Sequence, residues 1–151
     1  MAIVRGYAIH HAPAVKAAVD EADEPALADM CVIVDGLMRS TPAIAGIAGR
    51  RVPADRLVHL VDGVSSVALP HYEFAVSEAV RGWALGGEPA GRQVIPADTL
   101  GTLDALAACT AALGLSLWSR EVFVGLLAES VRAAEELVTD GRGGGNRDRS
   151  R

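Results

Sequence analysis

This chain has few aromatic side chains and almost no lysine. Among its 151 residues are two phenylalanines, two tryptophans and two tyrosines, and Lys16 is the only lysine. Strands draw on β-branched and aromatic side chains, whereas the apolar half of this composition is mostly alanine, valine and leucine. The scarcity of aromatics therefore disfavours a β-sandwich and favours closely packed helices. Arginine in place of lysine is typical of a GC-rich bacterial genome and says little about function.

Cysteines and long apolar runs are also few. Cys31 and Cys109 both lie in apolar helical patterns, which predicts two buried free thiols and no disulfide. The longest uncharged run, 105–119, is shorter than the roughly 20 residues that a membrane span needs. The first eleven residues contain no apolar region long enough for a signal peptide. We therefore expect a cytoplasmic protein without a membrane segment.

The formal charge of −5 is unevenly spread along the chain. Residues 141–151 hold four arginines and one aspartate, so they carry +3 and the rest of the chain carries −8. An acidic body argues against general binding to nucleic acid. The last eleven residues include three consecutive glycines and no apolar side chain, which predicts a disordered basic tail over 141–151. Residues 1–140 are then a single domain.

Prolines begin most of the helical patterns in this chain. Proline fits the first turn of a helix, because its missing N–H would have no partner there. The apolar spacing behind these prolines predicts helices over 13–22, 25–39, 42–48, from 53 onward, 71–85, 96–113 and 118–139. Residues 1–10 contain two short apolar groups around Gly6, which leave a short strand or an extended lead-in open.

The predicted helix over 96–113 is apolar on nearly every side. A helix without a polar face must be buried, so it is expected to be the central element, with Gly114 as its C-terminal cap. The helix over 118–139 has a polar face, and its core face holds five residues: Phe123, Leu127, Val131, Ala134 and Val138. The sequence thus predicts an all-α, single-domain bundle of five to seven helices around 96–113.

Two groups of titratable residues are the candidates for chemistry. His59 and Asp62 lie three residues apart on one predicted helix, where a carboxylate can orient an imidazole. His71, Tyr72 and Glu73 follow Pro70 at a predicted helix start, a position that favours anions. If all five converge, the protein is a small enzyme or a small-molecule-binding bundle with a pocket between helices. The adjacent pair His10 and His11 has no metal-site spacing and is expected in solvent.

Residues 39–56 resemble a helix-turn-helix layout, with a local excess of positive charge. Arg50, Arg51 and Arg56 are the residues that would contact DNA. The second helix of this unit is short and mostly apolar, whereas recognition needs polar side chains directed at base edges. DNA binding is therefore a second alternative that we do not favour.

No motif specifies a reaction, a cofactor or a metal site. The acidic run 20–24 ends at a proline and has no matching acidic pair, so it is interpreted as a solvated linker. The favoured hypothesis is a binding protein that forms a homodimer or serves as an accessory to a partner protein. Candidate interface positions are Trp83, Trp118 and the exposed side of the helix over 25–39, since tryptophan is enriched at interface hot spots.

Overall fold

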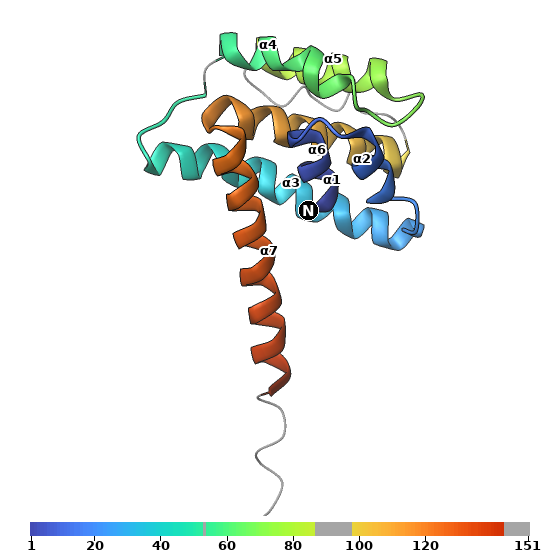
Figure 1. Cartoon of the computed structure of the whole chain (residues 1–151), viewed down its shortest axis with the longest axis vertical. Helices are drawn as coiled ribbons and strands as arrows, with labels where there is room; N and C mark the ends of the chain where they lie inside the picture. The colour runs from blue at the N-terminus through green and yellow to red at the C-terminus, as the bar shows by residue number, and fades with distance from the viewer. Residues whose placement is uncertain (53, 87–97, 144–151) are drawn as a thin grey trace, which may run out of the picture.

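The computed structural model describes residues 1–52, 54–86 and 98–143, and every regular element in these ranges is a helix. Figure 1 shows the arrangement. The helices are α1 (Ala2–Ala8), α2 (Ala12–Ala17), α3 (Glu24–Ile47), α4 (Ala54–Ser65), α5 (Glu73–Gly86), α6 (Thr99–Leu117) and α7 (Arg120–Gly143). The predicted all-α bundle is confirmed.

Helix α6 is the centre of the bundle. It is buried along almost its whole length, and α1, α3, α4 and α5 all pack against it (Figure 1). Asp98 caps its start, because the carboxylate accepts a 2.7 Å hydrogen bond from the Gly101 amide. The helix continues through Gly114, so the predicted cap at that residue is wrong. Gly114 instead makes room for Phe123, whose ring would lie 2.2 Å from a Cβ at position 114.

Helix α3 runs without interruption through Pro42, so the predicted break between residues 39 and 42 is wrong. The hydroxyls of Ser40 and Thr41 do not cap a new helix. Both turn back and donate to the Leu37 carbonyl, at 3.0 and 2.7 Å. Pro42 is exposed, and its ring removes one donor from the helix ladder without ending it. The result is one helix of 24 residues, about 36 Å long.

The N-terminal residues form helix α1, and not the strand or extended lead-in that the sequence left open. Ile3, Val4 and Tyr7 are spaced one and three residues apart, which places all three on one helical face, and all three are fully buried. Helices α1 and α2 meet closely at Gly6, where a Cβ would lie 2.9 Å from the Val15 nitrogen. A side chain at position 6 would therefore push α1 and α2 apart.

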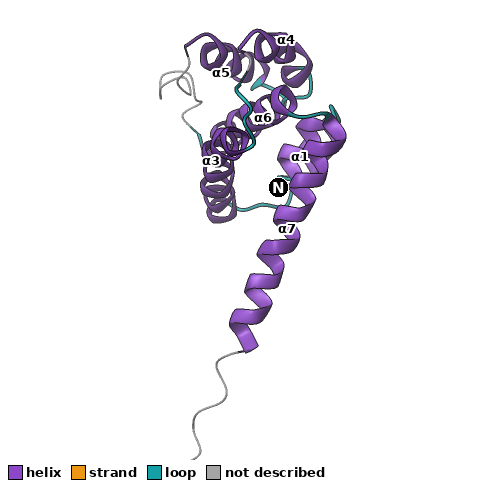
Figure 2. Ribbon diagram, turned by 90° about the vertical axis from the view of Figure 1, so that its left-hand side faces the viewer, coloured by secondary structure: helices purple, strands orange, loops and turns teal. Residues whose placement is uncertain are grey.

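Helix α7 leaves the bundle and projects away from it, as both views show (Figures 1 and 2). Phe123 and Leu127 are buried near its start, and the Phe123 ring stacks on Trp118 with centroids 6.3 Å apart. Ala134 and Val138, predicted for the same core face, have side chains outside the described part of the chain. Residues 141–143 of the predicted tail belong to α7, and residues 144–151 lie outside the described ranges.

Two helices, α3 and α6, are long and apolar enough to cross a membrane by length and composition alone. Within α6 the apolar window is 83% buried by the rest of the chain, which is typical of the core helix of a soluble protein. Within α3 only 22% of the window is buried. Part of the apolar surface of α3 therefore lies outside the core.

Candidate functional site

The five residues predicted to form a pocket are dispersed over the surface of α4, the α4–α5 turn and α5. His59, Asp62, His71 and Glu73 are exposed, and Tyr72 is half-buried. Asp62 pairs with Arg81 at 3.6 Å, and the Tyr72 hydroxyl donates to Asp98 at 2.9 Å. Within the described ranges, no hydrogen bond or ion pair joins any two of the five. Tyr72 thus connects the start of α5 to the cap of α6.

The buried polar centre of the molecule is a different set, which the sequence did not reveal. Asp104 is fully buried on α6, and its two carboxylate oxygens accept hydrogen bonds from the Tyr7 hydroxyl at 2.6 Å and the Leu69 amide at 3.2 Å. Burial raises the pKa of Asp104, and the two donors partly offset that rise. Burial, and then the neighbouring Asp104 charge, raises the pKa of Tyr7 far above its usual value, so the phenol stays a donor.

This centre joins three parts of the chain that are far apart in sequence. Tyr7 comes from α1, Asp104 from α6 and Leu69 from the turn between α4 and α5. Both side chains are fully buried, so the pair fastens α1 and the α4–α5 turn to α6 and is not open to a substrate.

His10 occupies a second unusual position, between α1 and α2. Its backbone is in the left-handed region, with φ at 54°. Its ring packs over Gly63 on α4, where a Cβ would lie 2.9 Å from Cε1. The Nε2 atom is buried and has no hydrogen-bond partner in the part of the chain that the structure describes. Burial, and then the positive charge of Arg120, lowers the pKa of His10. The arrangement therefore favours the neutral imidazole.

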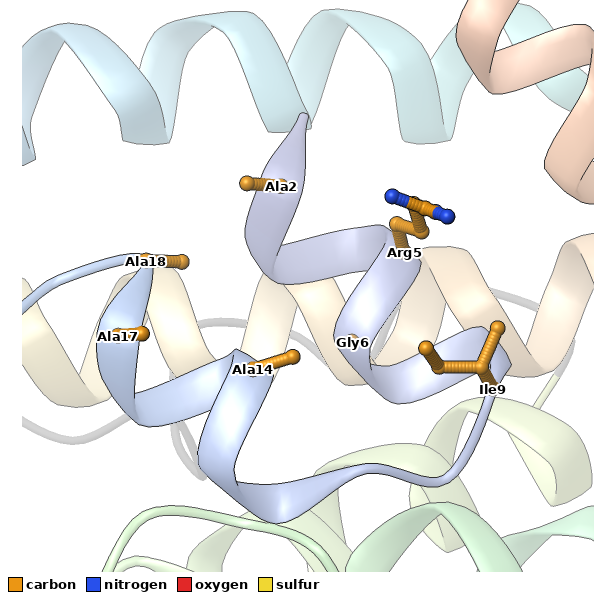
Figure 3. Close-up of a pocket in the computed structure, with 7 residues that line it drawn as sticks. All are labelled: Ala2, Arg5, Gly6, Ile9, Ala14, Ala17 and Ala18. Carbon is orange, nitrogen blue, oxygen red and sulfur yellow. The ribbon is translucent and has the colours of Figure 1, made fainter.

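A shallow groove of about 260 Å³ lies between α1 and α2 (Figure 3). Apart from Arg5, its walls are small or apolar residues: Ala2, Gly6, Ile9, Ala14, Ala17 and Ala18. A small-molecule site normally combines apolar walls with several convergent polar groups. Arg5 is a single polar side chain and does not supply several convergent polar groups. His59 and His71 do not line the groove.

The arginines considered for DNA binding have unequal roles in the structure. Arg50 donates to the Leu117 carbonyl at the end of α6, so its guanidinium fastens the chain after α3 to the core. Arg51 and Arg56 are exposed. Helix α4, the expected recognition helix, packs against α5 and α6.

Of the two tryptophans offered as interface positions, the structure describes the side chain of Trp118. Trp118 is half-buried and its ring stacks on Phe123, so it is engaged inside the chain. Trp83 lies in α5, and its side chain is outside the described residues.

The outward face of α3 is the most apolar exposed feature of the described structure. The exposed fractions of Val32, Ile33, Ile44 and Ile47 are 73%, 56%, 51% and 90%. The sequence predicted an exposed interface side for 25–39, which includes Val32 and Ile33. It missed Ile44 and Ile47, because Pro42 was interpreted as a break in the helix. We call the line of exposed residues Ile33, Gly36, Ser40, Ile44 and Ile47 the α3 face.

Neither a metal-binding cluster in the described residues nor a similarity to known proteins points to a further functional site. In the described part of the chain, no group of three or more histidine, cysteine, aspartate or glutamate side chains could hold a metal ion. The chain matches no protein-family model, no curated protein and no solved structure.

Proposed function

We propose that this protein acts by binding, as a helical module that associates with a second copy of itself through the α3 face. The supporting observation is that a helix of 24 residues has only five buried residues, yet carries four exposed branched apolar side chains. Together these four leave roughly 400 Å² of apolar surface in solvent, which is comparable to the largest apolar patch on a typical soluble protein, and such a patch is often functional. Three of the four, Ile33, Ile44 and Ile47, lie on the α3 face.

The remaining surface offers less support for catalysis. The five candidate residues His59, Asp62, His71, Tyr72 and Glu73 form no hydrogen bond or ion pair with one another in the described ranges; Asp62 pairs with Arg81 instead, and Tyr72 with Asp98. The Tyr7–Asp104 pair is enclosed. The groove between α1 and α2 has a single charged side chain, Arg5. Binding through an apolar helix face requires none of these groups.

The test is the molecular mass in solution, measured by sedimentation equilibrium over a range of concentrations. We expect the mass to rise from one copy toward two as the concentration increases, since two such helix faces bury on the order of 1,000 Å², the lower end of specific interfaces. Ile47→Asp should hold the protein at the mass of one copy, because it puts a carboxylate into the interface.

Phe74→Asp is the matched control. Phe74 is 79% exposed on α5, so this variant removes an equally accessible apolar side chain from another surface and should leave association unchanged. A mass of one copy at every concentration overturns the proposal. So does tight binding of that single copy to phosphatidylcholine vesicles, which would assign the α3 face to a lipid surface.

A further inference from the structure

The residues of the α3 face are placed symmetrically about Ser40. Gly36 and Ile44 lie four residues to either side of it, and Ile33 and Ile47 lie seven residues to either side. All five are exposed, and spacings of three and four keep them on one side of the helix. In an isologous dimer the same patch serves both copies, so a pattern that reads alike in both directions suits a two-fold axis.

Resting on the proposed self-association, we propose that two copies pair antiparallel along α3, with the two-fold axis at Ser40. In this register, each residue faces the residue at the same distance on the other side of Ser40. Ile33 of one copy meets Ile47 of the other, and Ile44 meets Gly36.

The contact between Ile44 and Gly36 makes the two helix surfaces complementary in shape. A Cβ built on Gly36 would meet nothing within 4 Å, so the surface above this residue is open. Ile44 is half exposed and branched, and can enter such a depression from a facing helix, as ridges enter grooves in helix packing. Ser40 at the crossing point is small enough for the two backbones to approach closely.

Cysteine cross-linking tests the direction directly, in the full chain with Cys31 replaced by alanine and buried Cys109 retained. Ser40→Cys should form a disulfide-linked dimer under mild oxidation. A mixture of the Ile33→Cys and Ile47→Cys proteins should give mostly the mixed dimer. If each of these two proteins instead links only to itself, the helices run parallel and the inference is overturned, while the proposed self-association stands.

The variant Gly36→Leu should weaken association without weakening the fold. Leucine favours the helix and meets no neighbour in the isolated chain, so the melting temperature of the single copy should rise. The dissociation constant should nevertheless rise at least tenfold, because the leucine occupies the space for Ile44.

The matched control is Gly46→Leu. Gly46 is also open but lies on the side of the Asp35–Arg39 pair, away from the α3 face, so association should be unchanged. Equal association of the Gly36→Leu protein and the unaltered chain overturns the register.

Discussion

The Tyr7 hydroxyl and the Asp104 carboxylate form a 2.6 Å hydrogen bond between residues 97 positions apart in the chain. This bond fastens the first helix to the central one in a fully buried setting. An unpaired polar group costs most in such a setting, because no water replaces the lost partner.

Removal of the Tyr7 hydroxyl should therefore destabilise the fold. Tyr7→Phe leaves one oxygen of Asp104 without its donor, and we expect the free energy of unfolding to fall by about 1–3 kcal/mol in urea titrations. Tyr72→Phe is the matched control, because Tyr72 also donates to an aspartate, but to the exposed Asp98. It should cost no more than about 0.5 kcal/mol. Equal losses in the two variants would contradict a special role for the buried bond.

His10 should make stability depend on pH below neutrality. The native pKa of His10 is lowered from its ordinary value of about 6.5, so the unfolded chain takes up a proton that the folded chain resists. Its contribution is complete above pH 6.5 and is lost as the pH falls toward the native pKa. His10→Asn, which tolerates the left-handed backbone, should flatten the slope of stability in this range. His59→Asn, an exposed substitution on α4, should leave the slope unchanged.

NMR titration of the His10 ring checks the cause of that slope. Arg120→Gln removes the positive charge at the start of α7 and should raise the pKa of His10. A pKa that does not move in this variant would show that burial alone is responsible.

Gly114 should not tolerate even one added methyl group. A Cβ at this position would lie 2.2 Å from the Phe123 ring, so Gly114→Ala must displace the residue that anchors α7. We expect a loss of about 1–3 kcal/mol in thermal unfolding, although alanine normally favours a helix over glycine. Gly125→Ala on α7 is the control, since its Cβ would meet nothing within 4 Å, and it should stabilise by up to about 1 kcal/mol. Stabilisation by both substitutions would mean that Phe123 packs elsewhere.

Cys109 should be inert in the folded protein. Burial raises the pKa of its thiol to about 12, so the thiolate at pH 8 is on the order of 10³-fold scarcer than at an ordinary cysteine. Iodoacetamide should leave Cys109 unmodified in the native state and modify it in urea, as read by mass spectrometry. Cys31 is half-buried and should react first. Rapid native alkylation of Cys109 would show that α6 is accessible to solvent.

The sequence predicts the central helix well, because a fully buried helix lacks a polar face and this can be recognised from its own residues. Helix α6 is apolar on nearly every side over residues 99–117, and a helix without a polar face must be buried. The prolines were less reliable markers. Pro25 lies in the first turn of α3, but Pro42 lies inside the same helix, because the tertiary packing of Met38 and Ala45 holds the helix together across it.

The candidate site was harder to predict, for a physical reason. The exposure of Val32 and Ile33 follows from the periodicity of 25–39 alone, and the rest of the α3 face follows only once the helix continues through Pro42. The Tyr7–Asp104 bond depends on how α1 lies on α6, and spacing within one segment carries no information about contacts between distant segments. Gly114 shows the same limit, since its role depends on the ring of Phe123 in the next helix.

A small tilt of α7 where it joins the bundle displaces the far end of this helix over a larger distance. It has 24 residues, and buried side chains near its start, Phe123 and Leu127, attach it to the bundle. Because the helix is about 36 Å long, a tilt of about 10° at this attachment carries its far end through about 6 Å. Small changes in the packing around Phe123 are thus magnified at the other end of α7, well outside the body of the protein.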